Sequence, residues 1–210
     1  MSAGSLFLIS APSGAGKTSL VDALIKAADN GKQQKLCVSV SHTTRPKRPG
    51  EVDGTNYHFI SPQAFSRMVT QGDFLEHAEV FGNYYGTSKA WVSERLQQGW
   101  NVILEIDWQG AAQVKQIMPE SVSIFILPPS LEALRARLTS RGQDDTDTIE
   151  KRMAEAVNEL SHYQQADYLL VNDDFELALS RLQAIIAHGH YQPSATEQAG
   201  IDALLQSLLP

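Results

Sequence analysis

Residues 6–21 constrain the fold more than any other part of the chain. Residues 6–10 (LFLIS) are mostly apolar and predict a short buried strand, and a helical pattern follows from Ser19. Between them, residues 11–18 read APSGAGKT, close to the phosphate-loop pattern G-x-x-x-x-G-K-S/T. Strand, loop and helix in this order predict an α/β fold with an anion site at the end of the first strand.

The loop pattern assigns a role to each residue type. Glycine is needed at Gly14 and Gly16, since side chains there would keep backbone N–H groups away from phosphates. Lys17 is expected to reach the β- and γ-phosphates of a nucleotide, and the Thr18 hydroxyl to ligate Mg²⁺. Ala11 departs from the pattern, because it stands where the first glycine is expected. The candidate ATP-binding residues of the loop are Ala11, Pro12, Ser13, Gly14, Ala15, Gly16, Lys17 and Thr18.

Composition limits the class of protein. The 210 residues suit one domain, or a core domain with inserted subdomains. The single cysteine, Cys37, excludes an internal disulfide framework and fits a reducing compartment. No apolar run approaches membrane-span length, so we expect a soluble, cytoplasmic protein without a membrane partner. The net charge of −7 argues against a nucleic-acid partner.

Helical and strand patterns alternate through the rest of the chain. Strands are predicted at 36–41, 55–60, 74–81, 84–87, 101–106, 122–127 and 168–171, and helices at 62–70, 88–98, 109–118, 131–140, 148–163 and 175–187. This alternation predicts a parallel sheet with helices on both faces. The segment from residue 189 on is weakly patterned, and we expect an appended tail there.

Two further places carry chemistry. Residues 42–54 form a proline- and glycine-rich loop, and its Arg45 and Arg48 favour a second phosphate site in this acidic chain. Glu105 and Asp107 close the predicted strand 101–106, at the sheet edge where ligands of open α/β sheets bind. An acidic residue there commonly serves the metal. The six histidines form no pair with zinc-ligand spacing.

Several motifs in this order resemble the guanylate kinase family of bacterial type. They are SAPSGAGKT, SHTTRPKRPGEVDGTNYHF, FGNYYGTS, ILEIDWQG, the Arg141-Gly142 segment and VNDD. The resemblance runs from about residue 6 to about residue 187. It implies ATP-dependent phosphorylation of GMP to GDP, with Mg²⁺, on a three-layer α/β P-loop kinase fold with a five-stranded parallel core sheet.

The resemblance also implies a division of the chain into parts. The core comprises residues 1–37, 88–140 and 164–190. An inserted small mixed-sheet subdomain, 38–87, binds GMP, and a short lid region covers 141–163. Residues 191–210 are left as a peripheral tail.

Functional residues carry over only where the motifs match. The implied GMP-binding residues are Ser41, Arg45, Arg48, Glu51, Tyr57, Glu76, Tyr85, Gly86, Thr87, Glu105 and Asp107. Within this set, Glu76, Ser41 and Thr87 would contact the guanine base. Many relatives have aspartate in place of Glu105, which leaves its contact open. The implied catalytic residues are Lys17, Arg45, Arg137, Arg141 and Arg152, Asn172 is implied near the adenine, and Thr18 and Asp107 are the implied metal ligands.

Charge neutralisation is the chemistry that such a set can perform. A triphosphate and a monophosphate repel each other, and lysine, Mg²⁺ and arginines offset that repulsion. Two alternatives are a non-catalytic module that binds peptides and a kinase acting on a phosphorylated sugar. The first is opposed by the presence of Gly14, Gly16, Lys17 and Thr18 together with the arginines, and the second by Glu76, Ser41 and Thr87, which favour a purine pocket. A GTP-hydrolysing switch would need an N-K-x-D motif, which the chain lacks. The sequence leaves homo-oligomerisation open.

Overall fold

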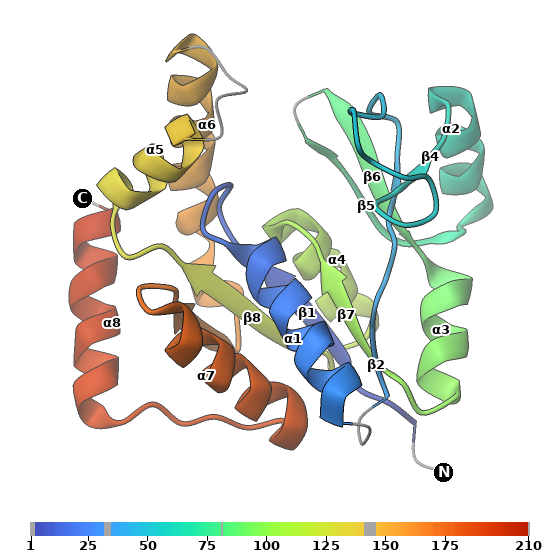
Figure 1. The fold of residues 1–210 in the computed structure, drawn as a ribbon. Coiled ribbons are helices and arrows are strands. Elements are labelled where there is room, and N and C mark those ends of the chain that lie inside the picture. Colours follow the sequence, from blue (N-terminus) through green and yellow to red (C-terminus); the bar gives the residue numbers. More distant parts are fainter. Residues whose placement is uncertain (1–2, 32–34, 81, 141–145, 210) are drawn as a thin grey trace. The chain divides into compact units, whose positions relative to one another are not determined.

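The structure is a computed structural model that describes residues 3–31, 35–80, 82–140 and 146–209. It is an α/β fold with a five-stranded parallel sheet and a separate four-stranded mixed sheet (Figure 1), which confirms the predicted fold class. The five strands lie in the order β2-β7-β1-β8-β9. Their bounds are β1 Leu6–Ser10, β2 Leu36–Val38, β7 Asn101–Glu105, β8 Val122–Leu127 and β9 Tyr168–Val171. No helix in the described ranges is long and apolar enough to cross a membrane.

The chain divides into two compact units. Unit 1 comprises Met1–Leu8 and Gln33–Ser121, and unit 2 comprises Ile9–Lys32 and Val122–Pro210. Each unit is therefore built from two separate stretches of chain. The GMP-side candidates of the sequence fall in unit 1, and the ATP-side candidates fall in unit 2.

Unit 1 contains the four-stranded sheet, whose strand order is β4-β3-β6-β5. The strands are β3 His42–Thr43, β4 His58–Phe59, β5 Phe74–Val80 and β6 Asn83–Ser88, and the helices are α2 Pro62–Gln71, α3 Lys89–Gln97 and α4 Trp108–Ile117. The pair β5–β6 is antiparallel and β3–β4 is parallel. Ser61 caps α2, since its hydroxyl accepts from the backbone N–H of Ala64 at 3.2 Å.

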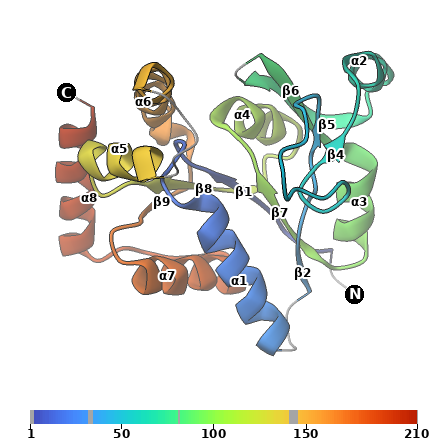
Figure 2. The same cartoon turned by 45° about the horizontal axis from the view of Figure 1, so that its top comes forward.

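The apolar core of unit 1 joins this sheet to the helices beside it. Leu75 of β5 lies in one buried cluster with Val92 of α3, Leu104 of β7 and Val114 of α4. Helix α4 packs directly against β5, which the turned view of Figure 2 also shows. Burial of these side chains fixes the position of β5 relative to α4 within the unit.

Unit 2 carries the phosphate loop and most of the remaining helices. Its helices are α1 Lys17–Gly31, α5 Leu131–Ser140, α6 Thr146–Leu160, the 3₁₀ turn η1 Tyr163–Gln165, α7 Phe175–His188 and α8 Ala195–Leu208. Helices α1 and α7 lie side by side, and α5 packs on α6 (Figure 1). Leu134 and Leu138 of α5 meet Met153 and Ala156 of α6 in a buried cluster.

The C-terminal segment corrects one expectation. Residues 195–208 form α8, and Ile201, Leu205 and Leu208 are buried in one cluster with Phe125 and Leu127 of β8. The expectation of a weakly patterned tail is therefore wrong. The signal was present: Ser194 and Glu197 form a capping box, and the apolar residues recur at helical spacing.

Two element boundaries differ from the sequence prediction for physical reasons. Helix α1 begins at Lys17, before the expected start at Ser19, because the Leu20 N–H already bonds to the Gly16 carbonyl at 3.1 Å. The strand predicted over 36–41 ends at Val38. Beyond it the chain joins the other sheet, where the Ser41 carbonyl accepts from the N–H of His58 at 2.9 Å.

Candidate functional site

The phosphate loop of unit 2 has the backbone that its glycines predict. Gly14 and Gly16 have φ angles of 93° and 96°, in the left-handed region that favours glycine. The Ala15 N–H donates to the Pro12 carbonyl at 3.0 Å, which closes a tight turn. A Cβ added at Gly16 would lie 2.4 Å from Nδ2 of Asn172, so a side chain there would collide with a buried amide. The loop thus passes close to β9 as well as curling tightly.

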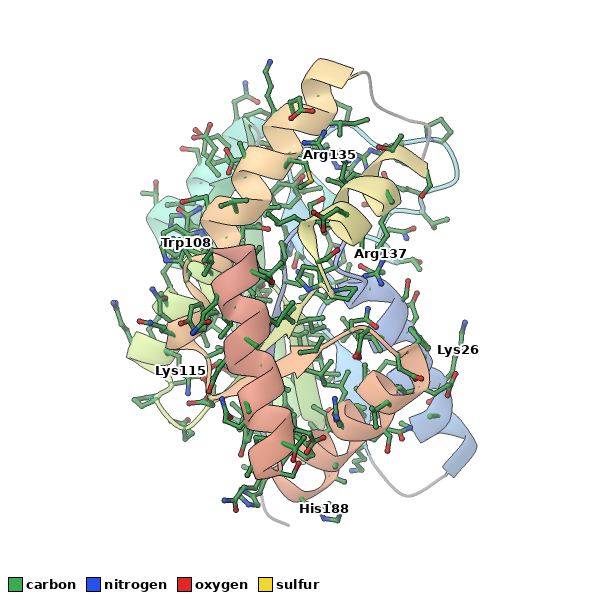
Figure 3. All side chains as sticks on the ribbon, turned by 90° about the vertical axis from the view of Figure 1, so that its left-hand side faces the viewer. Lys26, Trp108, Lys115, Arg135, Arg137 and His188 are labelled. Atoms are coloured by element: carbon green, nitrogen blue, oxygen red, sulfur yellow. The ribbon has the colours of Figure 1, made fainter. Side chains whose placement is uncertain are left out.

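Side chains from later in the chain hold this loop in shape. The Ala15 carbonyl accepts from Nδ2 of Asn172 at 2.7 Å and from Nη1 of Arg137 at 3.3 Å. Arg137 extends from α5 (Figure 3), and its Nη2 donates to the Asn172 carbonyl at 3.2 Å. The Ser13 N–H donates to Oε2 of Glu159, on α6, at 3.1 Å. A carboxylate oxygen thus sits on a loop amide, the kind of donor that binds phosphate oxygens.

The ATP-side candidates of unit 2 differ in their burial and in their contacts with the phosphate loop. Asn172 was expected near the adenine, and its side-chain amide is engaged with the loop backbone. Arg137 is engaged there too, whereas Arg152 lies partly buried on α6. Thr18 is exposed in the first turn of α1. Arg141 and the lid residues 141–145 lie outside the described residues.

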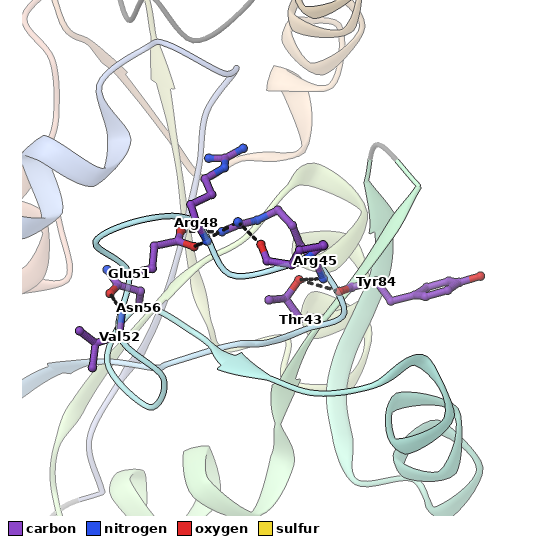
Figure 4. A network of polar contacts seen from close by, with 8 residues as sticks. Thr43, Arg45, Arg48, Glu51, Val52, Asn56 and Tyr84 are labelled. Atoms are coloured by element: carbon purple, nitrogen blue, oxygen red, sulfur yellow. Dashed lines mark hydrogen bonds and ion pairs between the residues drawn. The ribbon is translucent and has the colours of Figure 1, made fainter.

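In unit 1, Glu51 holds together the loop 42–54, which carries Arg45 and Arg48 and is called the arginine loop below (Figure 4). Its carboxylate accepts from both terminal nitrogens of Arg45, at 2.6 and 3.1 Å, and from the backbone N–H of Arg48 at 2.7 Å. The hydrogen bond from Arg45 is the main cause that lowers the pKa of Glu51, and the same bond raises the pKa of Arg45. Arg45 is therefore held charged and in a fixed place, while the Arg48 side chain is exposed.

Aromatic rings complete the surroundings of Arg45. Its guanidinium carbon lies 5.4 Å from the ring centroid of Tyr57 and 5.8 Å from that of Phe59. The Tyr57 and Tyr85 rings meet edge to face, with centroids 5.9 Å apart. Burial is the main cause that raises the pKa of Tyr57, so its hydroxyl stays protonated at neutral pH and can donate to an anion.

A buried carboxylate lies on the neighbouring strand. Glu76 of β5 is 4% exposed, and it pairs in register with the fully buried Thr87 of β6. The Thr87 hydroxyl donates to Oε1 of Glu76 at 2.5 Å. The family resemblance implies that Thr87 contacts the guanine base, but here its hydroxyl donates to Glu76. Gly86 also has a packing reason, since an added Cβ would lie 2.9 Å from the Phe74 ring.

The acidic pair beyond β7 has unequal surroundings. Asp107 caps α4, since its Oδ1 accepts from the Gly110 N–H at 2.8 Å and its Oδ2 accepts from Nε2 of Gln109 at 3.3 Å. Glu105 is partly buried at the last position of β7. Within the described ranges, no group of three histidine, cysteine or acidic side chains could hold a metal. Magnesium bound with a nucleotide needs only one or two protein oxygens besides phosphates, and the Thr18 hydroxyl of unit 2 and the Asp107 carboxylate of unit 1 are each oxygen groups of the kind it binds.

Comparison with known proteins decides the family. The family model described as guanylate kinase matches residues 3–189. This chain belongs to the guanylate kinase family. A guanylate kinase of Alkalilimnicola ehrlichii is 60% identical over 189 residues, which are 90% of this chain and 91% of the relative. One of Hahella chejuensis is 56% identical over 210 residues, covering 100% of this chain and 98% of the relative.

Solved structures agree with this assignment. The crystal structure of guanylate kinase from Anaplasma phagocytophilum has a TM-score of 0.73 and 34% identity, and the match covers 99% of this chain and 96% of that one. The resemblance to the guanylate kinase family inferred from the sequence motifs is thereby confirmed.

Sequence reasoning missed three residues that support the phosphate loop of unit 2 and strand β5 of unit 1. Glu159 contacts the phosphate loop from α6, while Gln113 and Gly110 contact β5 and Glu76 from α4. Glu159 and Gln113 act on main-chain atoms far away in sequence, which no local pattern indicates. Gly110 gave a weak signal, because glycine in a helix calls for a packing reason.

Proposed function

We propose that this chain transfers the γ-phosphoryl group of ATP to GMP, forming ADP and GDP. Membership of the guanylate kinase family supports the reaction. The observation that carries it for this chain is the buried Glu76 carboxylate, held by Thr87 on the same unit as an arginine loop. A carboxylate only accepts hydrogen bonds, so it suits the N1–H and amino donors of guanine and opposes the N1 lone pair of adenine.

The GMP side would use two kinds of contact. We assign the phosphate of GMP to Arg45, Arg48, Tyr57 and Tyr85, and the base to Glu76 with Ser41. Glu51 already offsets the charge of Arg45, so the exposed Arg48 supplies net positive charge for the incoming phosphate. Thr87 acts through Glu76, because its hydroxyl donates a hydrogen bond to that carboxylate.

The ATP side would rely on the phosphate loop. Its backbone N–H groups and Lys17 receive the phosphates, and the first turn of α1 adds the positive end of a helix dipole. Arg152, with Arg141, would neutralise charge on the transferring group, while Arg137 and Asn172 keep the loop in shape. When bound, Mg²⁺ would supply further charge neutralisation at Thr18 and Asp107.

Phosphoryl transfer here needs positioning more than proton transfer. The GMP phosphate is largely ionised near neutral pH, so its oxygen can attack the γ-phosphorus without a general base. Water must be kept out, because it would otherwise hydrolyse ATP. We assign this to movement of the inserted subdomain 38–87 and the lid region 141–163. The single cysteine supports a reducing compartment, which we take to be the cytoplasm.

A coupled ADP-release assay tests the function. With ATP and Mg²⁺ present, ADP release should require GMP as the acceptor. The same assay is then repeated with dGMP, AMP, CMP or UMP in place of GMP. Glu76→Gln should lower kcat/KM for GMP by at least about tenfold, since the amide loses a charge-assisted pair of bonds. AMP should gain relative to GMP in this variant. Equal losses for both acceptors, or no dependence on GMP in the wild type, would refute the assignment.

A further inference from the structure

Helix α4 encloses the carboxylate of Glu76 on the side away from Thr87. A Cβ added at Gly110, in the first turn of α4, would lie 2.6 Å from Oε2 of Glu76 and 3.2 Å from its carboxyl carbon. One carboxylate oxygen thus accepts from the Thr87 hydroxyl, and the other rests against a helix residue without a side chain. Both carboxylate oxygens of Glu76 therefore have a defined position. Only glycine at position 110 leaves room for the carboxylate in that position.

Helix α4 also makes hydrogen bonds to β5, the strand that carries Glu76. Gln113 pairs with both main-chain groups of His77: the His77 N–H donates to Oε1 at 3.1 Å, and Nε2 donates to the His77 carbonyl at 2.8 Å. This two-point contact replaces the neighbouring strand that the outer edge of β5 lacks in the strand order β4-β3-β6-β5. Because His77 follows Glu76 directly, the Gln113–His77 contact limits movement of β5 at Glu76.

We propose that α4 is the positioning element for guanine recognition, with Gly110 setting the depth of the Glu76 carboxylate and Gln113 holding its strand. This inference rests on the proposed GMP kinase function. Guanine offers two donors to a carboxylate, N1–H and the exocyclic amino group, whereas hypoxanthine offers only N1–H. A carboxylate held in one place can pair with both donors of guanine. The contacts from α4 therefore decide how strongly GMP is preferred over inosine monophosphate (IMP).

Gly110→Ala tests the first contact. Carbon and oxygen atoms settle at about 3.5 Å, so the added methyl group would move the carboxylate by about 1 Å. A displacement of that size can cost up to about a hundredfold in rate. We expect kcat/KM for GMP to fall at least tenfold, the GMP:IMP ratio to fall with it, and KM for ATP to stay within about twofold of the wild-type value.

Gly200→Ala is the matched control for that variant. Gly200 is also a helix residue, in α8, and a Cβ there would meet nothing within 4 Å. Alanine is the better helix former at both positions, so neither variant should lose thermal stability through helix propensity. We expect Gly200→Ala to match the wild type in all kinetic values.

Gln113→Ala tests the second contact and decides the matter if Gly110→Ala does not fold. Gln116→Ala, at an exposed position of the same helix, is its control. We expect KM for GMP to rise and the GMP:IMP ratio to fall in Gln113→Ala, with KM for ATP unchanged. A purely structural role would instead lower stability and affect GMP and IMP equally.

The two levels of inference fail in different ways. A wild-type protein that does not phosphorylate GMP would refute the proposed function itself. An active wild type whose Gly110→Ala and Gln113→Ala variants keep the GMP:IMP ratio would overturn only the role of α4.

Discussion

Asn172→Ala should make the phosphate loop less rigid, because it removes a side-chain hydrogen bond to the loop backbone. The Asn172 amide is 5% exposed and donates to the Ala15 carbonyl at 2.7 Å. Loss of one buried hydrogen bond costs about 1.5 kcal/mol when the acceptor keeps another donor, as it does in Arg137 at 3.3 Å. For a chain of this length, that corresponds to a fall in Tm of about 3 to 6 °C.

Activity and stability should both report this change. Because the loop amides lose their fixed direction, we expect kcat/KM for ATP to fall about tenfold, with KM for GMP nearly unchanged. Thermal unfolding without nucleotides gives the stability change, and a coupled ADP-release assay gives the kinetics. Asp173→Ala is the control, because the Asp173 side chain is exposed and its carboxylate accepts from the neighbouring N–H of Asp174.

A double-mutant cycle with Arg137→Ala makes the reasoning refutable. Either single variant leaves the buried Ala15 carbonyl with one donor, whereas the double variant removes both side-chain donors. The double variant should therefore lose about 1 kcal/mol more than the sum of the single losses. Additive losses, or an Asn172→Ala variant with wild-type ATP kinetics, would show that these contacts do not support the loop.

Three further results are expected. Lys17→Ala should lose at least about 3 kcal/mol of transition-state stabilisation while Tm stays near the wild-type value; near wild-type turnover at saturating substrates would contradict the loop assignment. Leu208→Ala should destabilise the protein by about 2 to 4 kcal/mol, because Leu208 is fully buried in the α8 cluster, whereas the exposed Gln206→Ala should change little in urea unfolding. Arg45 lowers the pKa of Glu51, so the wild type should be more stable than Glu51→Gln above pH 4.5, the ordinary pKa of the group, and lose this advantage as the pH falls below it. A difference in Tm that persists unchanged at lower pH would contradict that reasoning.

Local chemistry made part of the site predictable. The left-handed glycines of the phosphate loop follow from the motif itself, because Gly14 and Gly16 need that backbone wherever the loop occurs. The cap of α2 at Ser61 is likewise a contact between residues close in sequence. The parallel sheet followed from the regular alternation of strand and helix patterns.

Contacts between distant residues were beyond reach of these patterns. Asn172 and Ala15 are 157 positions apart, and no periodicity links an asparagine after β9 to a loop carbonyl. Gln113 and His77 are 36 positions apart, and a glutamine on a helix usually reads as a solvated residue. Helix α8 is a different case, since its capping box at Ser194 and its apolar spacing were visible in the sequence.

The two-stretch construction of unit 2 determines when its phosphate loop can become functional. The loop and α1 belong to the first stretch, and Arg137, Glu159 and Asn172 all belong to the second, Val122–Pro210. Closing a chain segment of this span costs about 4 kcal/mol in entropy, which later packing must repay. During synthesis the phosphate loop is therefore made early, whereas the three residues that hold it in shape are made more than a hundred residues later. A chain stopped before Val122 would carry the whole motif without these three supports, so we expect it to bind nucleotide poorly.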